Sequence, residues 1–241
     1  QLYPRAIPEL PSLRLIGMCD PARMVSGDYY DYQQLGPDRV AIAIGDVAGK
    51  GISAALLMAT VQSSFRTQLR GSIEMAAAAG DAISKATVST SSVVSHLNQQ
   101  LFADTSPEKF ATFFLGVYDE PSGALTYTNA GHLPPILIHR GEALKLEVNG
   151  MVVGAFPFAQ YGESSVVLTG GDLLVFYTDG ITEPENEYGE MFGEQRLIDL
   201  VQKNSHLDDS EIISILTQAV RQWTGSDELQ DDMTLLLARR R

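Results

Sequence analysis

A carboxylate and a cation stand a few residues apart in the segment 45–51, Gly-Asp-Val-Ala-Gly-Lys-Gly. The apolar, β-branched run 40–44 before it predicts a buried strand, and the apolar spacing over 54–69 after it predicts a helix. Asp46 is therefore expected at a strand end, beside a glycine-rich turn and a helix N-terminus. Such a junction can hold a cation through its carboxylate and receive an anion near Lys50, which suggests phosphate chemistry.

This segment is not a Walker loop, because only three residues separate Gly45 from Gly49 and Gly51 stands where the Mg²⁺-binding Ser or Thr belongs. Taken alone, it is equally consistent with a plain strand end followed by a turn. A functional interpretation therefore depends on partner residues elsewhere in the chain.

Further carboxylates adjoin other predicted strands. Asp28 follows Ser26-Gly27 and precedes an alternating aromatic segment, and Asp179 lies at the end of the apolar run 172–180. Asp231 and Asp232 lead into the last apolar strand. By itself Asp28 is also explained as a turn residue. Carboxylate oxygens without a cysteine or histidine cluster suit Mg²⁺ or Mn²⁺ better than Zn²⁺ or copper, and bound cations would relieve the repulsion between converging carboxylates.

The elements that must position these residues follow from hydrophobic periodicity and turn signals. A strand-turn-strand over 29–44, with its turn at 36–38, would bring Asp28 and Asp46 to one sheet edge. We expect the second helix to end near 102, with a weaker pattern over 86–92, and later helices at 190–203 and 208–223. The short strands predict an antiparallel meander over 111–148, and the strands are expected at 13–18, 111–119, 124–131, 135–141, 143–148, 164–169, 172–180 and 235–238.

Length and composition narrow the class of protein. The 241 residues predict one domain, 1–241, in which the Pro-rich segment 1–12 is an extended lead-in that we interpret as the end of a linker from upstream regulatory segments. The net charge of −13 argues against a nucleic-acid-binding surface. No apolar run is long enough for a membrane span, so we expect no membrane contact. A single cysteine, Cys19, excludes internal disulfides and predicts a reducing compartment, the cytoplasm.

Six motifs, in this order, resemble the sporulation stage II E branch of the metal-dependent Ser/Thr protein phosphatases, which is related to protein phosphatase 2C. The resemblance covers about 11–240, and the motifs are SGDYYD at 26–31, GDVAGKGISAALLMA at 45–59, FFLGVYD at 113–119, TNAGHLPP at 128–135, LLVFYTDGITE at 173–183 and DDMTLLL at 231–237. It implies an α+β fold: a four-layer αββα sandwich of two mainly antiparallel sheets flanked by helices.

The resemblance also implies a site for two Mn²⁺ or Mg²⁺ ions at one end of the sandwich. Asp46 would bridge both ions, and the backbone carbonyl of Val47 would be a further ligand. Asp28 would serve one ion, and Asp179 and Asp231 the other. Asp232 stands where relatives often have Asn, so it would support the ligands without binding metal itself, although Asp231 and Asp232 could exchange these roles.

Other residues match the family less specifically. Asn129, Gly131 and His132 match a turn that shapes the cleft, and a general-acid role for His132 is a minority interpretation. The arginine with which 2C relatives contact phosphate has no obvious counterpart in this sequence. Arg23 and Lys50 are the candidates for that contact.

The activity implied by the resemblance is hydrolysis of phosphoserine or phosphothreonine by a metal-activated water. The expected partner is a phosphorylated regulatory protein, such as a bacterial STAS-type anti-sigma-factor antagonist, and oligomers could form through upstream segments. One alternative is a catalytically silent module that keeps the sandwich to bind a partner. Another is a metal-dependent phosphodiesterase or nuclease, which the net negative charge disfavours.

Overall fold

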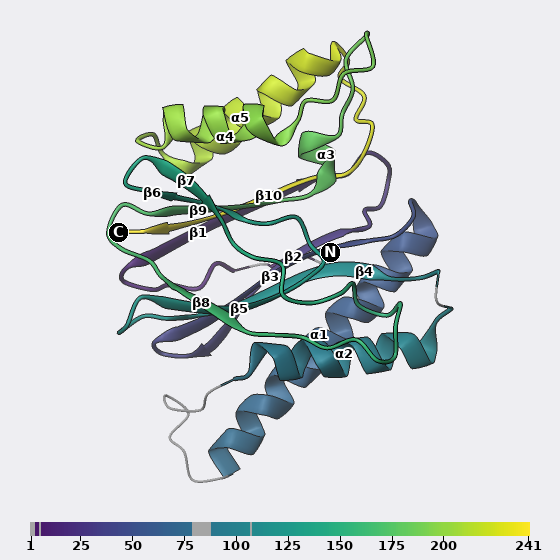
Figure 1. Cartoon of the computed structure of the whole chain (residues 1–241), viewed down its shortest axis with the longest axis vertical. Coiled ribbons are helices and arrows are strands. Elements are labelled where there is room, and N and C mark those ends of the chain that lie inside the picture. Colours follow the sequence, from purple (N-terminus) through teal and green to yellow (C-terminus); the bar gives the residue numbers. More distant parts are fainter. Residues whose placement is uncertain (1–2, 5, 79–87, 107) are drawn as a thin grey trace.

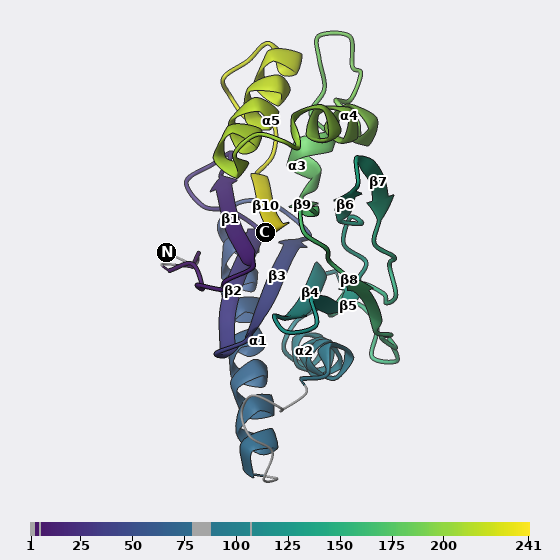
Figure 2. The same cartoon turned by 90° about the vertical axis from the view of Figure 1, so that its left-hand side faces the viewer.

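Two five-stranded antiparallel sheets lie face to face between helices in the computed structural model, which describes residues 3–4, 6–78, 88–106 and 108–241 (Figure 1, Figure 2). Sheet 1 has the strand order β1-β10-β9-β6-β7, and its strands are β1 (Leu13–Asp20), β10 (Met233–Arg240), β9 (Leu173–Tyr177), β6 (Ile136–His139) and β7 (Glu142–Lys145). Sheet 2 has the order β2-β3-β4-β5-β8, and its strands are β2 (Asp28–Gly36), β3 (Arg39–Val47), β4 (Ala111–Asp119), β5 (Ala124–Ala130) and β8 (Ser164–Val167).

Strand β3 is apolar along its length because both of its faces are covered. Val40, Ile42 and Ile44 point into the core between the two sheets, whereas Ala41 and Ala43 point toward the helices that cover sheet 2. The small alanine side chains allow a helix to pack close to the sheet.

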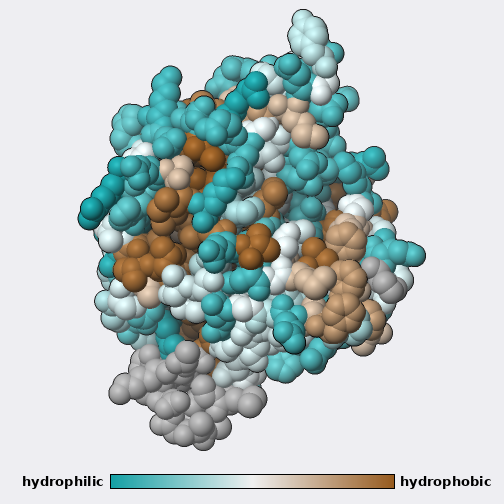
Figure 3. Space-filling view, in the orientation of Figure 1, coloured by the Kyte–Doolittle hydropathy of each residue, from teal (hydrophilic) through white to brown (hydrophobic). Residues whose placement is uncertain are grey.

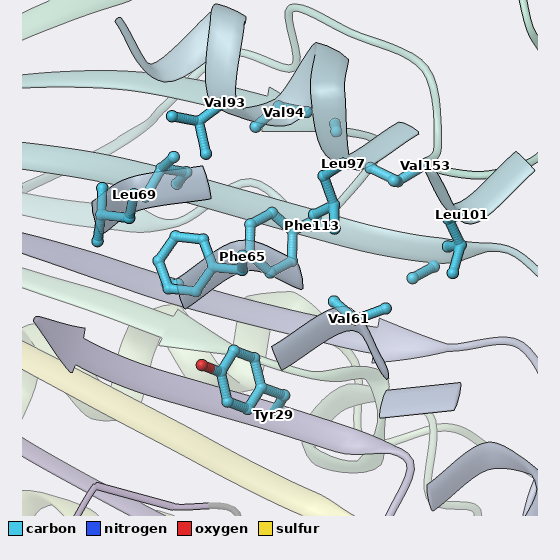
Figure 4. Packing of buried hydrophobic residues seen from close by; sticks show 14 of the residues in the cluster. Tyr29, Val61, Phe65, Leu69, Val93, Val94, Leu97, Leu101, Phe113 and Val153 are labelled. Carbon is cyan, nitrogen blue, oxygen red and sulfur yellow. The ribbon is translucent and has the colours of Figure 1, made fainter. Parts of the chain in front are cut away.

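Helices α1 (Ile52–Ala78) and α2 (Thr90–Asp104) cover the outer face of sheet 2. Phe65 of α1 meets Phe113 of β4 in an edge-to-face contact with ring centroids 5.5 Å apart, and Val94 and Leu97 of α2 pack beside them (Figure 4). These residues recur at helical spacing, which is why the sequence predicted both helices.

Helices α4 (Glu194–Asn204) and α5 (Asp209–Thr224) cover sheet 1 and complete the four layers. Helix α5 begins with a capping box, in which the Asp208 side chain and Glu211 exchange hydrogen bonds with each other's backbone amides. Between the sheets, Phe114 stacks on Tyr127 at 5.3 Å and meets Phe176 edge-on at 5.1 Å. The predicted four-layer sandwich is confirmed.

One topological prediction is wrong. The segment 111–148 does not form a meander in one sheet, because β4 and β5 belong to sheet 2 whereas β6 and β7 belong to sheet 1. The chain crosses between the sheets at 131–135, where Pro134 and Pro135 have no amide hydrogens to continue a ladder. Strand β6 then pairs with β9 instead of β5, with Ile136 opposite Val175.

Several element boundaries also differ from the predicted ones. Helix α1 continues to Ala78, and α2 begins at Thr90 after the Ser89 side chain accepts a hydrogen bond from the Ser92 amide. Residues 86 and 87 of the weak helical pattern lie outside the described residues. Strand β7 ends at Lys145, and α4 begins only at Glu194 because Gly193 has φ +80°.

The described part of the lead-in packs against the sheets. The Tyr3 ring stacks on Tyr30 with centroids 5.3 Å apart, and its hydroxyl donates to the Cys19 sulfur at 2.9 Å. Leu10 is buried, and the Ser12 amide donates to Glu120 at 2.9 Å. Residues 1, 2 and 5 of the predicted lead-in lie outside the described residues, and its interpretation as the end of a linker stays a prediction.

Hydrophilic residues cover most of the upper part of the face drawn in Figure 3, where α4 and α5 lie. The edge strands β7 and β8 carry the exposed apolar residues Leu144 and Val167. Within the described ranges, none of the helices has the length and apolarity needed to cross a bilayer.

Candidate metal centre

The predicted carboxylates lie at one end of the sandwich, which we call the mouth; it is the end at which α3 and the start of α1 are drawn on the right in Figure 1. Asp28 opens β2 and lies directly opposite Asp46, near the end of the neighbouring strand β3. Asp179 follows β9, and Asp231 precedes β10, the strand that pairs with β9. Sheet 2 thus supplies the first two carboxylates, and sheet 1 supplies the other two.

Asp28 joins the sheets directly. It is buried, and its Oδ2 accepts hydrogen bonds from the hydroxyls of Thr178 at 2.7 Å and Thr234 at 2.6 Å, both on sheet 1 or at its end. Burial, followed by the charge of Asp46, raises the pKa of Asp28 well above its usual range. Sequence reasoning missed the two threonines, although Thr178 directly precedes Asp179 and Thr234 lies two residues after Asp232.

Asp46 faces the carboxylates of sheet 1. Burial, followed by the charges of Asp179 and Asp231, raises the pKa of Asp46 to about 7. Burial and then the charges of Asp231 and Glu183 raise the pKa of Asp179, against the opposing effect of the Gly180 amide and Lys50. Asp46, Asp179 and Asp231 are far apart in the sequence but close enough in the fold for their charges to repel one another.

The Asp179 side chain stands in a different local structure from the predicted one. The strand ends at Tyr177, and Asp179 begins the short helix α3 (Asp179–Thr182). Gly180 lies so close to the next ligand-bearing segment that an added Cβ would be 1.9 Å from the Asp232 carbonyl oxygen. Only glycine permits this approach of the two backbones.

Asp231 and Asp232 have different partners. The carboxylate of Asp232 accepts the amides of Ala22 and Gly27, each at 2.8 Å, and so holds the loop that leads to Asp28. Asp231 instead pairs with the Lys50 ammonium at 2.5 Å. The two neighbours are therefore not equivalent: Asp231 pairs with Lys50 and Asp232 with the loop amides, while the charge of each adds to the effect of burial in raising the pKa of Asp46.

The candidate phosphate contacts lie at the same mouth. Arg23 and Lys50 line a hollow of about 140 Å³ together with Asp231 and Asp232. A second hollow, of about 180 Å³, is lined by Lys50, Asp179, Glu183 and Asp231 among others. The Val47 carbonyl oxygen is close by, 3.6 Å from the point where a Cβ on Gly27 would stand.

The turn 129–132 adjoins the strands that carry the carboxylates, because its His132 ring bonds Thr112, which lies opposite Asp46. The Asn129 side chain bonds both the amide of His132 at 2.8 Å and its carbonyl at 3.1 Å. Gly131 has φ +71°, and a Cβ there would be 2.8 Å from the Val152 side chain. The turn is thus fixed by its own side chains and needs glycine at its centre.

His132 is enclosed in the protein. Its Nε2 lies 3.1 Å from the Tyr177 carbonyl, which can only accept, so Nε2 carries the proton and Nδ1 accepts from the Thr112 hydroxyl at 2.8 Å. Burial lowers the pKa of His132 to about 4. A buried, neutral imidazole with both nitrogens engaged shapes the mouth and does not suit a general acid.

The donor set fits hard divalent cations. Among the described residues, no three His, Cys, Asp or Glu side chains are grouped tightly enough to hold an ion by themselves. Mg²⁺ does not require such a cage, because it is usually bound by one or two carboxylates and keeps several waters. Burial, and after it mutual repulsion, raises the pKa of Asp46 and Asp179, and a bound cation would stabilise their ionised forms.

Two antiparallel sheets between helix pairs are also the fold of the PP2C phosphatase domain of SpoIIE from Bacillus subtilis, which matches with a TM-score of 0.73 at 22% identity over 94% of this chain and 63% of that one. The family model described as "Stage II sporulation protein E (SpoIIE)" matches residues 36–241, and the chain belongs to this family. The resemblance found in the six motifs is thereby confirmed.

Two relatives illustrate the match. The chain is 33% identical to protein IcfG of Synechocystis sp. over 97% of this chain and 39% of the relative. It is 27% identical to phosphoserine phosphatase RsbU of Bacillus subtilis over 98% of this chain and 65% of the relative. The chain therefore spans less than two thirds of the length of each.

Solved structures agree on the fold. The structure of the RsbU and RsbW domains of Rv1364c from Mycobacterium tuberculosis matches with a TM-score of 0.74 and 26% identity, covering 96% of this chain and 60% of that one. The catalytic domain of the serine/threonine phosphatase PstP, solved in complex with two manganese ions, matches with a TM-score of 0.65 over 95% of this chain and 98% of that one. At 13% identity, the second match shows the fold alone.

Proposed function

We propose that the chain is a divalent-metal-dependent phosphatase that hydrolyses phosphoserine or phosphothreonine on a regulatory protein. The observation that carries this proposal is the convergence of Asp46, Asp179 and Asp231. These residues adjoin strands of two different sheets, and, after burial, the charges of Asp179 and Asp231 raise the pKa of Asp46. The family and the name of the relative RsbU, a phosphoserine phosphatase, point to the same chemistry.

In this proposal the oxygens of the mouth hold two Mn²⁺ or Mg²⁺ ions. Asp46 would serve both ions, and the Val47 carbonyl would be a further ligand. Asp28 would serve one of the ions, and Asp179 and Asp231 the other. When bound, such ions lower the pKa of a coordinated water and offset charge on a phosphoryl group. The catalytic domain of PstP, which shares this fold, was solved with two manganese ions, and the proposal extends such a pair of ions to this chain.

The protein itself contributes position and charge. Thr178 and Thr234 hold one oxygen of Asp28 in place, and we assign its other oxygen to the proposed ion. Asp232 fixes the loop 21–27, and Arg23 on that loop and Lys50 flank the hollow in which we place the substrate phosphate. Cations placed there would stabilise the charge of the phosphoryl oxygens during in-line displacement.

The proposed partner is a small phosphorylated regulator of the STAS type, acting in bacterial sigma-factor control in the cytoplasm. The names of RsbU and of the RsbU and RsbW domains support a regulatory setting. The substrate itself is inferred from the family resemblance. The same holds for the extent of the catalytic domain, which we take to be the whole of 1–241.

Mn²⁺-dependent hydrolysis of p-nitrophenyl phosphate by the 241-residue chain tests the enzyme class. Asp46→Asn and Asp179→Asn should each lower kcat by about a hundredfold or more, because each removes a ligand charge, while circular dichroism stays native. Asp199→Asn, on the exposed face of α4, is the matched control and should retain full activity. Undiminished turnover by the Asp46 variant would refute the assignment.

Two further assays separate the alternatives. Calorimetric titration with Mn²⁺ that gives no heat, together with no turnover, would favour a silent binding module. Cleavage of plasmid DNA would favour a phosphodiesterase or nuclease. Activity on small phosphoesters without activity on any phosphorylated STAS-type protein would keep the enzyme class and remove the proposed partner.

A further inference from the structure

We infer that Lys50 competes with the divalent ion for Asp231 and, once displaced, turns to the substrate phosphate, so that metal loading and phosphate binding share one side chain. This inference rests on the proposed function and concerns a positioning residue of the same site. Lys50 has two alternative partners: its contact with Asp231 opposes metal binding, and its contact with the substrate phosphate favours turnover.

The first partner is seen directly. The Lys50 ammonium lies 2.5 Å from Oδ2 of Asp231 and 3.4 Å from the Gln230 carbonyl oxygen. A carboxylate oxygen that accepts an ammonium so closely must give up much of that contact to coordinate a cation, because the two positive charges repel each other. Lys50 and a metal ion at Asp231 therefore oppose each other.

The surrounding charges strengthen this competition. Asp232 lines one of the two hollows that Lys50 also lines, and Asp179 and Glu183 line the other, so several carboxylates surround the Lys50 ammonium. One ammonium thus partly neutralises several carboxylates, which is also what a bound divalent cation would do.

The second partner is available without a large movement. Lys50 is common to both hollows at the mouth: one lies on the side of Asp179 and Glu183, and the other on the side of Arg23. The Lys50 side chain is 54% exposed. A rotation about its own side-chain bonds would move the ammonium from Asp231 toward the Arg23 side.

The backbone of the turn leaves room for this change. Gly49 and Gly51 flank Lys50 with φ +111° and +75°, and nothing lies within 4 Å of a Cβ built on either. The turn is anchored on both sides, by the end of β3 and the start of α1. Lys50 therefore stands on a short, open loop held between two rigid elements.

The test measures Mn²⁺ binding and turnover separately in the 241-residue chain. In Lys50→Met the Mn²⁺ dissociation constant, measured by isothermal titration calorimetry at pH 7.5, should fall roughly threefold to tenfold because a competing charge is gone. At saturating Mn²⁺, kcat/KM for p-nitrophenyl phosphate should fall about tenfold or more because the phosphate loses a cation. If Lys50 only stabilised the fold, its loss would not strengthen Mn²⁺ binding while lowering kcat/KM.

Two controls make the outcome decisive. Lys50→Arg keeps the charge and should leave the dissociation constant close to that of the unaltered chain. Lys109 lies next to the start of α1, where its ammonium donates to the Ser53 hydroxyl at 2.9 Å. Lys109→Met should change neither the Mn²⁺ dissociation constant nor kcat/KM.

Each result bears on a distinct claim. Unchanged or weaker Mn²⁺ binding in Lys50→Met overturns the competition, even if turnover falls. Tighter binding with unchanged turnover overturns the second role of Lys50. If the unaltered chain binds no Mn²⁺ at all, the proposed function and this inference both fail, whereas a failure confined to the variant leaves the proposed function standing.

Discussion

At the scale of the residue, the His132 ring ties three parts of the mouth together. It bonds the Tyr177 carbonyl at the end of β9 and the Thr112 hydroxyl on β4, and its backbone is held by Asn129. Thr112 lies opposite Asp46 in the sheet register, and Tyr177 precedes Asp179 by two residues. His132 thus supports both of the sheets that carry the carboxylates.

This histidine should make stability depend on pH in a defined direction. Its pKa is about 4 in the folded chain and 6.5 ordinarily, so between these values the unfolded chain binds more protons. The contribution of neutral His132 to the free energy of unfolding is fully present above pH 6.5. It should fall by up to about 3 kcal/mol as the pH drops to 4.

The measurement is urea unfolding of the unaltered chain and of His132→Gln, both in EDTA at pH 7.5 and pH 4.5. Acidic groups common to both chains cancel in the difference between them. The destabilisation caused by the substitution should be smaller at the lower pH. An equal difference at the two pH values would contradict a buried neutral histidine.

Single residues were predictable where their chemistry is explicit in the sequence. Asp28, Asp46 and Asp231 stand at strand ends, and the register and charges place them together. Thr178 and Thr234 were not predicted, because nothing in a threonine next to a strand indicates that its hydroxyl reaches a carboxylate on another sheet. Such partners depend on tertiary approach and not on local pattern.

At the scale of the element, a buried ion pair fixes α1 on sheet 2. Asp31 of β2 is fully buried and accepts two hydrogen bonds from the Arg66 guanidinium, at 2.7 and 3.1 Å, and one from the Tyr29 hydroxyl at 2.5 Å. Helix α1 begins one residue after the turn that carries Lys50. The pair therefore anchors the helix whose first turn adjoins the mouth.

Removing one partner should leave an unpaired buried charge. Arg66→Met should lower the free energy of unfolding by about 2–3 kcal/mol, less than for a fully buried pair because Arg66 is partly exposed. Urea unfolding with an unchanged m-value measures this loss. Arg70→Met, one helical turn further along and exposed, should cost less than about 0.5 kcal/mol.

A compensating change makes this prediction sharper. Adding Asp31→Asn to the Arg66→Met chain should recover part of the lost stability, since the buried side chain is then neutral. Strict additivity of the two substitutions would show that the guanidinium and the carboxylate do not depend on each other.

Elements were predictable in type more often than in their place within the fold. Apolar periodicity predicted α1, α2, α4, α5 and most strands, but it could not assign a strand to one of two sheets with similar apolar faces. Strands β6 and β7 were therefore placed beside β5 in the prediction, whereas β6 pairs with β9. Similarly, the apolar run up to Tyr177 gave no sign that Asp179 starts a helical turn.

At the scale of the whole molecule, the mouth is where the two sheets are joined by polar side chains. Asp28 of sheet 2 bonds Thr178 and Thr234 on the side of sheet 1. Away from the mouth, apolar residues such as Phe114 and Phe176 pack between the sheets, and the Tyr30 hydroxyl of β2 donates to the Gly17 carbonyl of β1 at 3.1 Å. Metal ions held by Asp46 and Asp179 would add a second connection between the same layers.

Metal binding should therefore stabilise the entire sandwich. At about one hundred times its dissociation constant, Mn²⁺ should add about 2.7 kcal/mol and raise the Tm by roughly 5–10 °C, and excess EDTA should reverse the shift. Differential scanning fluorimetry measures it, with the Asp46→Asn, Asp179→Asn double variant as the control that shows no shift. Hydrogen exchange at 177–179 and 233–235 should slow in parallel; a Tm that ignores Mn²⁺ in the unaltered chain would contradict the bridging role.

The contact between Gly180 and the Asp232 carbonyl has a consequence for comparing this chain with other sequences. A methyl group at position 180 would collide with that oxygen. A chain of this fold with any larger residue there must therefore hold the segments that carry Asp179 and Asp232 further apart. The residue at this one position can thus serve as a diagnostic marker: glycine indicates a chain in which these two segments can approach each other as they do here, even where every aspartate is retained.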